Sequence, residues 1–195
     1  MIFEAHYIDV LRRRTLLFVF SLRAITKAWW WGIEISSDIK VFGRIYFRRL
    51  PKSSIKIGKK CLFNSSANSN LIGINRPCMI STLERGASIV IGDNCGFSGT
   101  VIGAFRSITI GNNVKCGANT LITDSNWHGD DPRSGEPKPV SIGDNVWLGV
   151  NSTVLKGVTI GANSVIGANS VVTRDIPENV TAAGNPCRVI NDLSC

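Results

Sequence analysis

Histidine is scarce in this chain of 195 residues, which contains only His6 and His128. A catalytic zinc site of the three-histidine type therefore cannot be built from one chain, and we expect no metal. The chain also has no G-x-x-x-x-G-K-[ST] and no G-x-G-x-x-G stretch. Nucleotide hydrolysis and dinucleotide redox chemistry consequently have no support in the sequence.

Paired cysteines, a cleavable leader and a long apolar segment are missing as well. None of the six cysteines forms a C-x-x-C pair, and the start of the chain shows no small-residue cleavage site. The uncharged run Thr15–Leu22 is far short of the ~20 apolar residues that span a bilayer. These absences predict a reducing, cytoplasmic location and no transmembrane helix.

Positive charge is concentrated at one end of the chain. Residues 1–60 carry thirteen Lys and Arg against four acidic residues, which is +9, whereas residues 61–195 carry nine against ten, which is −1. A nucleic-acid-binding domain would spread basic residues over its folded face, so we expect no nucleic-acid partner. The basic segment is better matched to an anionic surface.

A repeat of six residues dominates the second half of the chain. An aliphatic residue recurs at every sixth position and is followed four residues later by a small or branched one, in segments that read "IGDNVW", "LGVNST", "VLKGVT" and "IGANSV". This period suits short strands joined by Gly, Asp and Asn corners, and three such segments close a triangular coil of 18 residues. The aliphatic positions are Ile142, Leu148, Val154, Ile160, Ile166 and Val172.

Earlier copies of the repeat extend the same pattern towards the N-terminus, with "IGNNVK" from Ile110, "IGDNCG" from Ile91 and "IGKKCL" from Ile57. The sequence therefore predicts an all-β fold, a parallel β-helix with one continuous core. Three cysteines, Cys61, Cys95 and Cys116, fall on inward positions, so we interpret them as small core residues. The repeat does not place Cys78, Cys187 or Cys195.

The run "IGDNVWLGVNSTVLKGVTIGANSVIGANSVVTRDIPENVTAAGNPCRVI" resembles the hexapeptide-repeat acyltransferases, most closely the galactoside and maltose acetyltransferases and the O-acetyltransferases of polysaccharide biosynthesis. The resemblance covers roughly residues 85–190. It implies a left-handed β-helix, a homotrimer, acetyl coenzyme A as the acyl donor and an active site between neighbouring subunits.

The repeat is interrupted by the stretch "TLITDSNWHGDDPRSGEPKPVSIG", because Ile122 and Ile142 lie twenty residues apart where an in-phase coil would give eighteen. We expect the chain to leave the β-helix here in a polar loop, residues 123–139, stiffened by three prolines. An imidazole is well suited to accept a proton from a hydroxyl near neutral pH. His128 is therefore the candidate general base, and an exposed loop histidine without function is the alternative.

The resemblance implies further site residues. It assigns Asn119 to substrate contact and catalysis, although a corner asparagine with a left-handed backbone explains it equally well. The loop residues Asp124 and Asn126 are candidate acceptor contacts, and one of Asp124, Asp130 and Asp131 could orient the imidazole. The donor is expected near Trp147, near the backbone amides of Val150 and Ala168, and near Thr173, Arg174 and Arg188. Trp147 could equally pack on a neighbouring subunit, and the two arginines could be solvated surface residues.

Residues 8–31 predict a basic helix, with apolar residues at helical spacing and five basic residues between Arg12 and Lys27. Two interpretations compete: a cap on the open end of the β-helix, which we favour, and a segment that lies on an anionic membrane through residues 1–35. The corresponding division of the chain is 1–50 as a basic, partly helical segment, 51–190 as the β-helix and 191–195 as a tail.

The sequence thus favours an acetyl coenzyme A-dependent O-acetyltransferase, cytoplasmic or peripheral at the inner face of the membrane. Its expected acceptor is a saccharide hydroxyl in cell-surface polysaccharide biosynthesis, and a lipid-linked glycan suits the basic N-terminal segment better than a free sugar does. The alternatives are an amino-sugar N-acetyltransferase and a non-catalytic β-helix scaffold.

Overall fold

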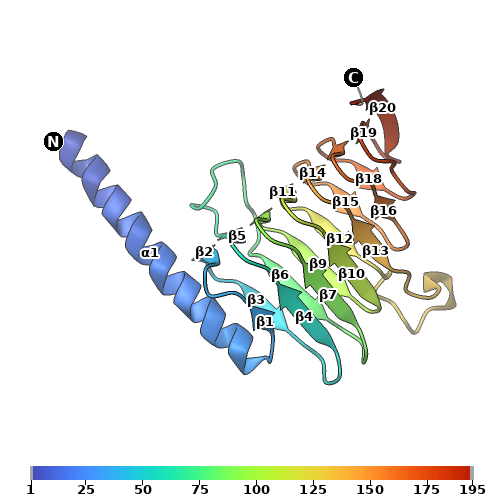
Figure 1. Cartoon of the computed structure of the whole chain (residues 1–195), viewed down its shortest axis with the longest axis horizontal. Helices are drawn as coiled ribbons and strands as arrows, with labels where there is room; N and C mark the ends of the chain where they lie inside the picture. Colours follow the sequence, from blue (N-terminus) through green and yellow to red (C-terminus); the bar gives the residue numbers. More distant parts are fainter. Residues whose placement is uncertain (1, 194–195) are drawn as a thin grey trace.

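The computed structural model describes residues 2–193 and consists of one long helix followed by twenty short strands (Figure 1). The helix α1 spans Ile2–Trp30. The strands of the first half are β1 (Glu34–Ile35), β2 (Lys40–Gly43), β3 (Tyr46–Arg48), β4 (Ser54–Ile57), β5 (Leu62–Ser65), β6 (Met79–Thr82), β7 (Ser88–Ile91), β8 (Gly96–Ser98), β9 (Val101–Ala104), β10 (Ser107–Ile110), β11 (Lys115–Ala118) and β12 (Leu121–Thr123). The short 3-10 helix η1 (Pro132–Ser134) precedes β13 (Val140–Ile142), β14 (Trp147–Leu148), β15 (Thr153–Val154), β16 (Thr159–Ile160), β17 (Val165–Ile166), β18 (Val171–Val172), β19 (Val180–Ala183) and β20 (Arg188–Asp192).

The strands form three parallel sheets, each of which takes every third strand of the coiled region. One sheet has the order β1-β4-β7-β10-β13-β16, the second runs from β2 to β19 and ends with β20, and the third contains β3, β6, β9, β12, β15 and β18. Among the strands of residues 2–193, only β20 pairs antiparallel, with β19. This is the left-handed parallel β-helix that the sequence predicts.

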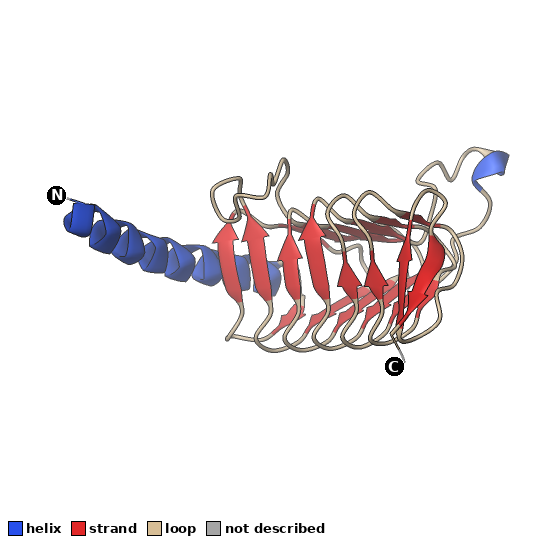
Figure 2. Ribbon diagram, turned by 90° about the horizontal axis from the view of Figure 1, so that it is seen from above, coloured by secondary structure: helices blue, strands red, loops and turns tan. Residues whose placement is uncertain are grey.

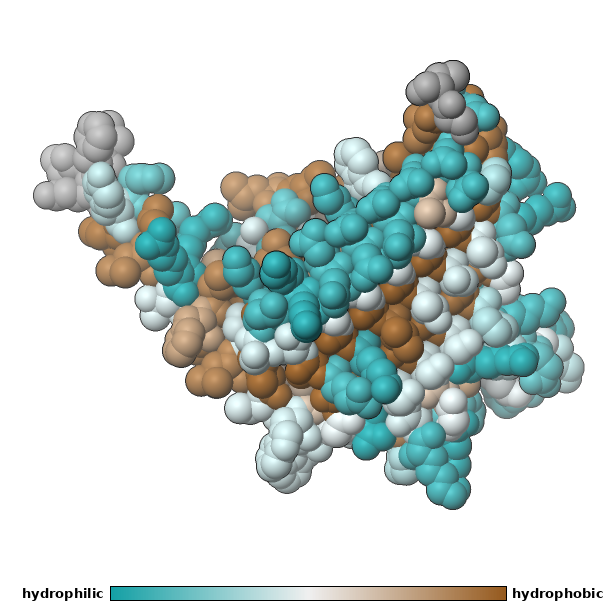
Figure 3. All heavy atoms as spheres, in the orientation of Figure 1, coloured by the Kyte–Doolittle hydropathy of each residue, from teal (hydrophilic) through white to brown (hydrophobic). Residues whose placement is uncertain are grey.

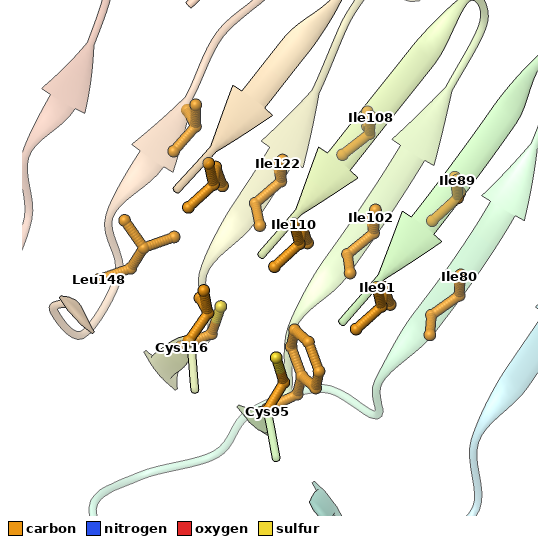
Figure 4. Close-up of a cluster of buried hydrophobic side chains, with 14 of the residues drawn as sticks. Ile80, Ile89, Ile91, Cys95, Ile102, Ile108, Ile110, Cys116, Ile122 and Leu148 are labelled. Atoms are coloured by element: carbon orange, nitrogen blue, oxygen red, sulfur yellow. The ribbon is translucent and has the colours of Figure 1, made fainter. Parts of the chain in front are cut away.

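One aliphatic residue from each coil stacks directly on its counterpart in the next coil. Ile91 pairs with Ile110, Ile110 with Ile142, and Ile142 with Ile160, and these side chains are at most 2% exposed. Figure 4 shows the rows of isoleucines that result. Because burying such a side chain contributes about 1.5–3 kcal/mol, the rows supply the core of the whole β-helix.

The cysteines are buried in this core. The three that the repeat places inward, Cys61, Cys95 and Cys116, are at most 4% exposed, as predicted. The repeat could not place Cys78 and Cys187, and the structure buries both of them. Burial raises the pKa of the Cys78 thiol to about 11, so this thiol stays protonated near neutral pH. Cys195 lies outside the described residues.

Asparagine forms two corners of the coil through a left-handed backbone, which this residue tolerates better than others with a Cβ. At one corner the φ angles lie between 57° and 59°. The side chains there bond from coil to coil over 2.8–3.0 Å, in a ladder of Asn94, Asn113, Asn145, Asn163 and Asn179. A second ladder links Asn119, Asn151 and Asn169 over 3.2–3.3 Å.

The β-helix begins earlier than residue 51. The strands β1, β2 and β3 already pair with β4, β5 and β6, so residues 34–50 form its first coil. The sequence missed this coil because its corners lack the Gly-Asn signal: "SSD" (residues 36–38) stands where a later coil has "GDN" (residues 92–94).

The C-terminal part of α1 covers the open end of the first coil. Ala24 and Ala28 are buried, and the hydroxyl of Ser21 accepts a hydrogen bond from Val41 N–H at 2.9 Å. The Lys27 ammonium donates to the carbonyl of Ile45 at 3.4 Å. This part of the helix therefore caps the core, in agreement with one of the two interpretations of the segment.

The rest of α1 extends past the β-helix into solvent (Figure 2). Its outer face carries an apolar stripe at spacings of four and seven residues, each member 52–80% exposed, and Figure 3 shows hydrophobic residues along this flank. We call Tyr7, Leu11, Phe18, Leu22 and Trp29 the outer stripe. Within residues 2–193, no helix combines the length and apolarity that crossing a membrane would require.

Candidate functional site

The polar loop leaves the β-helix after β12 and rejoins it at β13, and it projects from the body of the molecule (Figure 2). Ile122 pairs with Val154, whereas Ile142 pairs with Ile110. The two isoleucines therefore lie in different sheets, one six-residue step apart, and twenty residues minus six gives an insertion of fourteen. The sequence located the loop correctly, since residues 124–139 lie between β12 and β13, but it counted only two extra residues because it compared residues from two sheets as if they shared one.

Asp124 anchors the start of the loop. Its side chain is fully buried, and its two carboxylate oxygens accept hydrogen bonds from the N–H groups of Phe105 and Arg106, both at 2.7 Å. Burial raises the pKa of this carboxyl above its ordinary value, while the backbone donors act in the opposite direction. Both oxygens are occupied within the chain, so Asp124 fixes the loop rather than presenting a free carboxylate to a ligand.

Trp127 sets the direction of the chain just before the candidate base. Its backbone is left-handed, with φ of 67°, and its indole N–H donates to the hydroxyl of Thr123 at 2.9 Å. The ring lies against Gly103, where an added Cβ would come within 2.5 Å of it, and meets Phe105 edge to face at 5.4 Å. The sequence did not suggest this structural role for Trp127, although an aromatic residue next to the only histidine of the loop could have indicated it.

His128 follows Trp127, and its side chain is exposed. Its carbonyl accepts a hydrogen bond from Asp131 N–H at 3.1 Å, whereas its imidazole has no hydrogen bond or ion pair with any residue in the range 2–193. Asp131 pairs instead with Arg133. Neither Asp124 nor Asp131 therefore orients the imidazole within one chain.

The far side of the loop is tied down by polar contacts. The Asn126 amide donates to the carbonyl of Ser134 at 3.0 Å, and the Lys156 ammonium donates to the carbonyls of Ser134 and Glu136. Lys138 N–H donates to the carbonyl of Asp124 at 2.9 Å. These contacts hold the loop on both sides of the exposed His128.

Asn119 lies at a corner with φ of 61° and is 6% exposed. Its amide oxygen accepts a hydrogen bond from Asn75 N–H at 3.0 Å, and its amide nitrogen donates to the carbonyl of Gly73 at 2.9 Å. Arg76 reaches the Asn119 carbonyl. The side chain therefore holds a second excursion, residues 66–78 between β5 and β6, which the sequence analysis did not detect because the repeat there is irregular.

The residues expected to bind the donor lie on consecutive coils near the C-terminal end. Val150 and Ala168 stack, since Asn169 N–H donates to the Val150 carbonyl at 2.8 Å. Their own amide N–H groups donate to no other atom of residues 2–193, so both can serve an external acceptor. Trp147 is 55% exposed and points outward. The side chains of Thr173, Arg174 and Arg188 are exposed.

Comparison with known families matches residues 139–174 to the hexapeptide repeat of succinyl-transferase. The galactoside O-acetyltransferase of Escherichia coli is 44% identical over 115 residues, which is 56% of each chain. The galactoside O-acetyltransferase of Lactococcus lactis is 50% identical over 93 residues, which is 44% of each chain. The chain thus matches about half the length of these curated relatives, and the expected resemblance to hexapeptide-repeat acetyltransferases is confirmed.

Solved structures share the fold. The N-acyltransferase AntD from Bacillus cereus, in complex with dTDP-4-amino-4,6-dideoxyglucose and coenzyme A, superposes with a TM-score of 0.66 at 16% identity, covering 89% of this chain and 90% of that one. A hexapeptide-repeat acetyltransferase from Vibrio cholerae, complexed with acetyl coenzyme A, gives a TM-score of 0.50 at 21% identity, covering 96% and 90%. At these identities the likeness concerns the fold.

The Asp124 anchor yields a testable prediction. Asp124→Asn should lower the free energy of unfolding by about 1–3 kcal/mol, because the amide has one oxygen for two buried N–H donors and turns an N–H towards the other. Chemical denaturation measures the loss, and hydrogen exchange should show faster exchange in residues 124–139. Asp130→Asn, on an exposed carboxylate of the same loop, is the matched control and should change stability by less than about 0.5 kcal/mol. Equal stability of the two variants would contradict the anchor.

Proposed function

We propose that this chain, which carries the hexapeptide repeat and resembles the hexapeptide-repeat acetyltransferases, transfers an acetyl group from acetyl coenzyme A to a saccharide hydroxyl. One observation supports the proposal above the others. The loop that carries His128 is fixed by Asp124, Trp127 and Lys156, and the His128 side chain on it is exposed. An exposed imidazole on a fixed loop, with no partner among the described side chains, is available to a substrate.

The chemistry follows from that imidazole. His128 takes the proton from the acceptor hydroxyl as the hydroxyl oxygen attacks the thioester carbonyl carbon, and an oxyanion forms at the carbonyl oxygen. The C–S bond then breaks, the acetyl group stays on the acceptor oxygen, and the imidazolium returns its proton to the leaving thiolate. Backbone N–H groups are suitable donors for the oxyanion. The products are an acetyl ester and coenzyme A, so atoms and charges balance without a metal.

Acetyl coenzyme A fits the backbone donors described above. Its pantetheine arm carries amide carbonyls, which can accept hydrogen bonds from the unused N–H groups of Val150 and Ala168. Trp147 offers an exposed aromatic face beside them, and the arginines Arg174 and Arg188 supply positive charge for phosphates. We assign the donor to this strip of the β-helix.

The site requires a second subunit. The imidazole of His128 faces solvent in one chain, and the donor strip lies on the later coils, so one chain does not enclose a reaction centre. We propose a homotrimer in which the loop of one subunit closes over the donor strip of its neighbour. Asn126, whose side chain is exposed, is then a candidate acceptor contact through this interface, whereas Asn119 is buried and its amide is bonded to Asn75 and Gly73.

Two alternatives use the same scaffold. Transfer to an amino sugar needs the same base and differs only in the attacking atom, and AntD is an N-acyltransferase with the same fold. A non-catalytic scaffold would need no positioned base, which argues against it here. We favour the O-acetyl product because both curated relatives named above are O-acetyltransferases. The proposed pathway is cell-surface polysaccharide biosynthesis. Mild alkali cleaves esters and spares amides, so mass spectrometry of the product before and after alkali distinguishes O-acetylation from N-acetylation.

The decisive variant for the proposed activity is His128→Ala. It should lower turnover by at least ~10²-fold, the usual scale for a general base, and should leave coenzyme A binding unchanged. Turnover is followed as thiol release over a panel of sugars and linked glycans. His6→Ala, which removes the exposed histidine of α1, is the control and should keep wild-type turnover. Wild-type activity in His128→Ala would refute the mechanism.

We further propose that α1 attaches the enzyme to the cytoplasmic face of an anionic membrane. The outer stripe presents large apolar side chains to solvent, and the exposed guanidinium groups of Arg12, Arg14 and Arg23 flank it. Each basic residue near an anionic bilayer contributes on the order of 1 kcal/mol. The excess charge of the first 60 residues thereby matches an anionic surface better than it matches a second copy of the same basic helix.

Vesicle cosedimentation tests this attachment. The protein should pellet at low salt with vesicles that contain phosphatidylglycerol and stay in solution with pure phosphatidylcholine vesicles. Phe18→Ser/Leu22→Ser should reduce the bound fraction several-fold through lost apolar burial. The control Val189→Ser/Ile190→Ser removes comparably exposed apolar side chains from β20 and should bind normally. If the stripe variant binds as well as the control, or changes the oligomeric state instead, the stripe is not a membrane contact.

A further inference from the structure

A cleft lies between α1 and the second excursion, at the opposite end of the chain from the donor strip. Its main cavity is about 670 Å³. The walls come from α1, from the β2–β3 region and from residues 65–77. A smaller cavity of about 360 Å³ continues it along α1 and shares Phe20, Gly43, Arg44 and Tyr46 with it. We call the two together the helix–loop cleft.

Positive charge lines this cleft almost without compensation. The main cavity contains Arg12, Arg13 and Arg44, and the smaller one adds Arg23 and Lys27. Arg13 forms an ion pair with Asp9 at 3.5 Å. Among the described side chains, those of residues 6–193, the other four cations have no carboxylate within ion-pair distance. Because five cations and only one carboxylate surround the same cavity, the cations repel one another. A multiply charged anion bound between them would relieve that repulsion.

The geometry of the walls suits phosphate attached to a larger group. Guanidinium groups bind phosphate oxygens through paired N–H donors. Arg13 is already positioned, because it lies 5.8 Å from the centre of the Phe42 ring and donates to the carbonyl of Asn68 at 3.3 Å. The Lys27 ammonium lies 4.8 Å from the Tyr46 ring centre. Aromatic and aliphatic walls beside the cations can cover an apolar or aromatic substituent.

The second excursion links this cleft to the corner at Asn119, just before β12 and the long loop. At one end Asn68 meets Arg13, and at the other end Asn75 N–H donates to the side chain of Asn119. Asn75 follows Asn68 by seven positions, so the two contacts lie no more than about 25 Å apart even for a fully extended chain. A single segment therefore borders both the basic cleft and Asn119.

We infer that the helix–loop cleft binds a diphosphate group that is carried by the acceptor saccharide. The identification of the bound molecule as the acceptor rests on the proposed acetyltransferase function, whereas the binding of a diphosphate rests on the cleft alone. The shared chemistry is a sugar diphosphate ester, whose second substituent is either a nucleoside or a lipid. An unphosphorylated free sugar would use none of these cations.

Calorimetry with inorganic pyrophosphate at low salt tests the cleft directly, on the full chain with saturating coenzyme A. The coenzyme occupies the donor strip, so its own phosphate site is filled. The wild type should bind one pyrophosphate per chain. Arg12→Ala/Arg44→Ala, at two exposed positions, should weaken binding by at least about tenfold. The control Arg48→Ala/Arg85→Ala removes the same charge at exposed positions outside the cleft and should stay within about threefold of wild type.

Competition identifies the source of the diphosphate. Uridine diphosphate glucose and farnesyl diphosphate are each titrated against bound pyrophosphate, and the better competitor indicates a nucleotide-linked or a lipid-linked acceptor. No pyrophosphate binding, equal loss in both double variants, or displacement by coenzyme A would overturn the inference. If thiol release requires His128 but is unchanged in Arg12→Ala/Arg44→Ala, the proposed function holds and the inference about the acceptor fails. If pyrophosphate binds in the cleft but no acetyl group is transferred, the anion site holds and the proposed function fails.

Discussion

The vertical stacking of one aliphatic side chain on the next is the constraint on which the rest of the structure depends. A parallel β-helix buries its core only if every coil returns its inward residue to the position directly above the previous one, as Ile110 and Ile142 do despite the loop between them. Corners must therefore turn sharply, and left-handed asparagines such as Asn145 and Asn163 make those turns while their amides bond from coil to coil. Additional chain can be accommodated only as excursions from a corner, so the two long loops are the places where function can be added without disturbing the core.

The repeat made most of this fold predictable. Regular coils after Ile142 showed their strands, core and corners in the sequence, and the three inward cysteines followed from the same period. The first coil and the 66–78 excursion escaped detection because their corners lack the Gly-Asn signal, so periodicity had nothing to count. The candidate base was predictable as the histidine of an excursion. The anchoring role of Asp124 was not, since its partners Phe105 and Arg106 lie on a preceding coil and only the folded register brings them together.

The helix α1 combines two properties that the sequence presented as alternatives. Near its C-terminal end, Ala24 and Ala28 complete the core, while the outer stripe and the basic residues beside it remain available along the rest of its length. One face of the helix thus closes the β-helix, one borders the helix–loop cleft, and one is free for a surface. The proposed anion-binding cleft therefore lies next to the proposed membrane-binding stripe, an arrangement that would suit an acceptor held at a membrane.

The claim that the reaction centre forms only between subunits is tested most directly by measuring mass and activity on the same eluate. Size-exclusion chromatography with light scattering, followed by a thiol-release assay across the peak and across a dilution series, gives both. The account predicts a species of about three times the 21.2 kDa chain mass that carries all of the activity, and a loss of activity in step with dissociation. An active species of single-chain mass would contradict it.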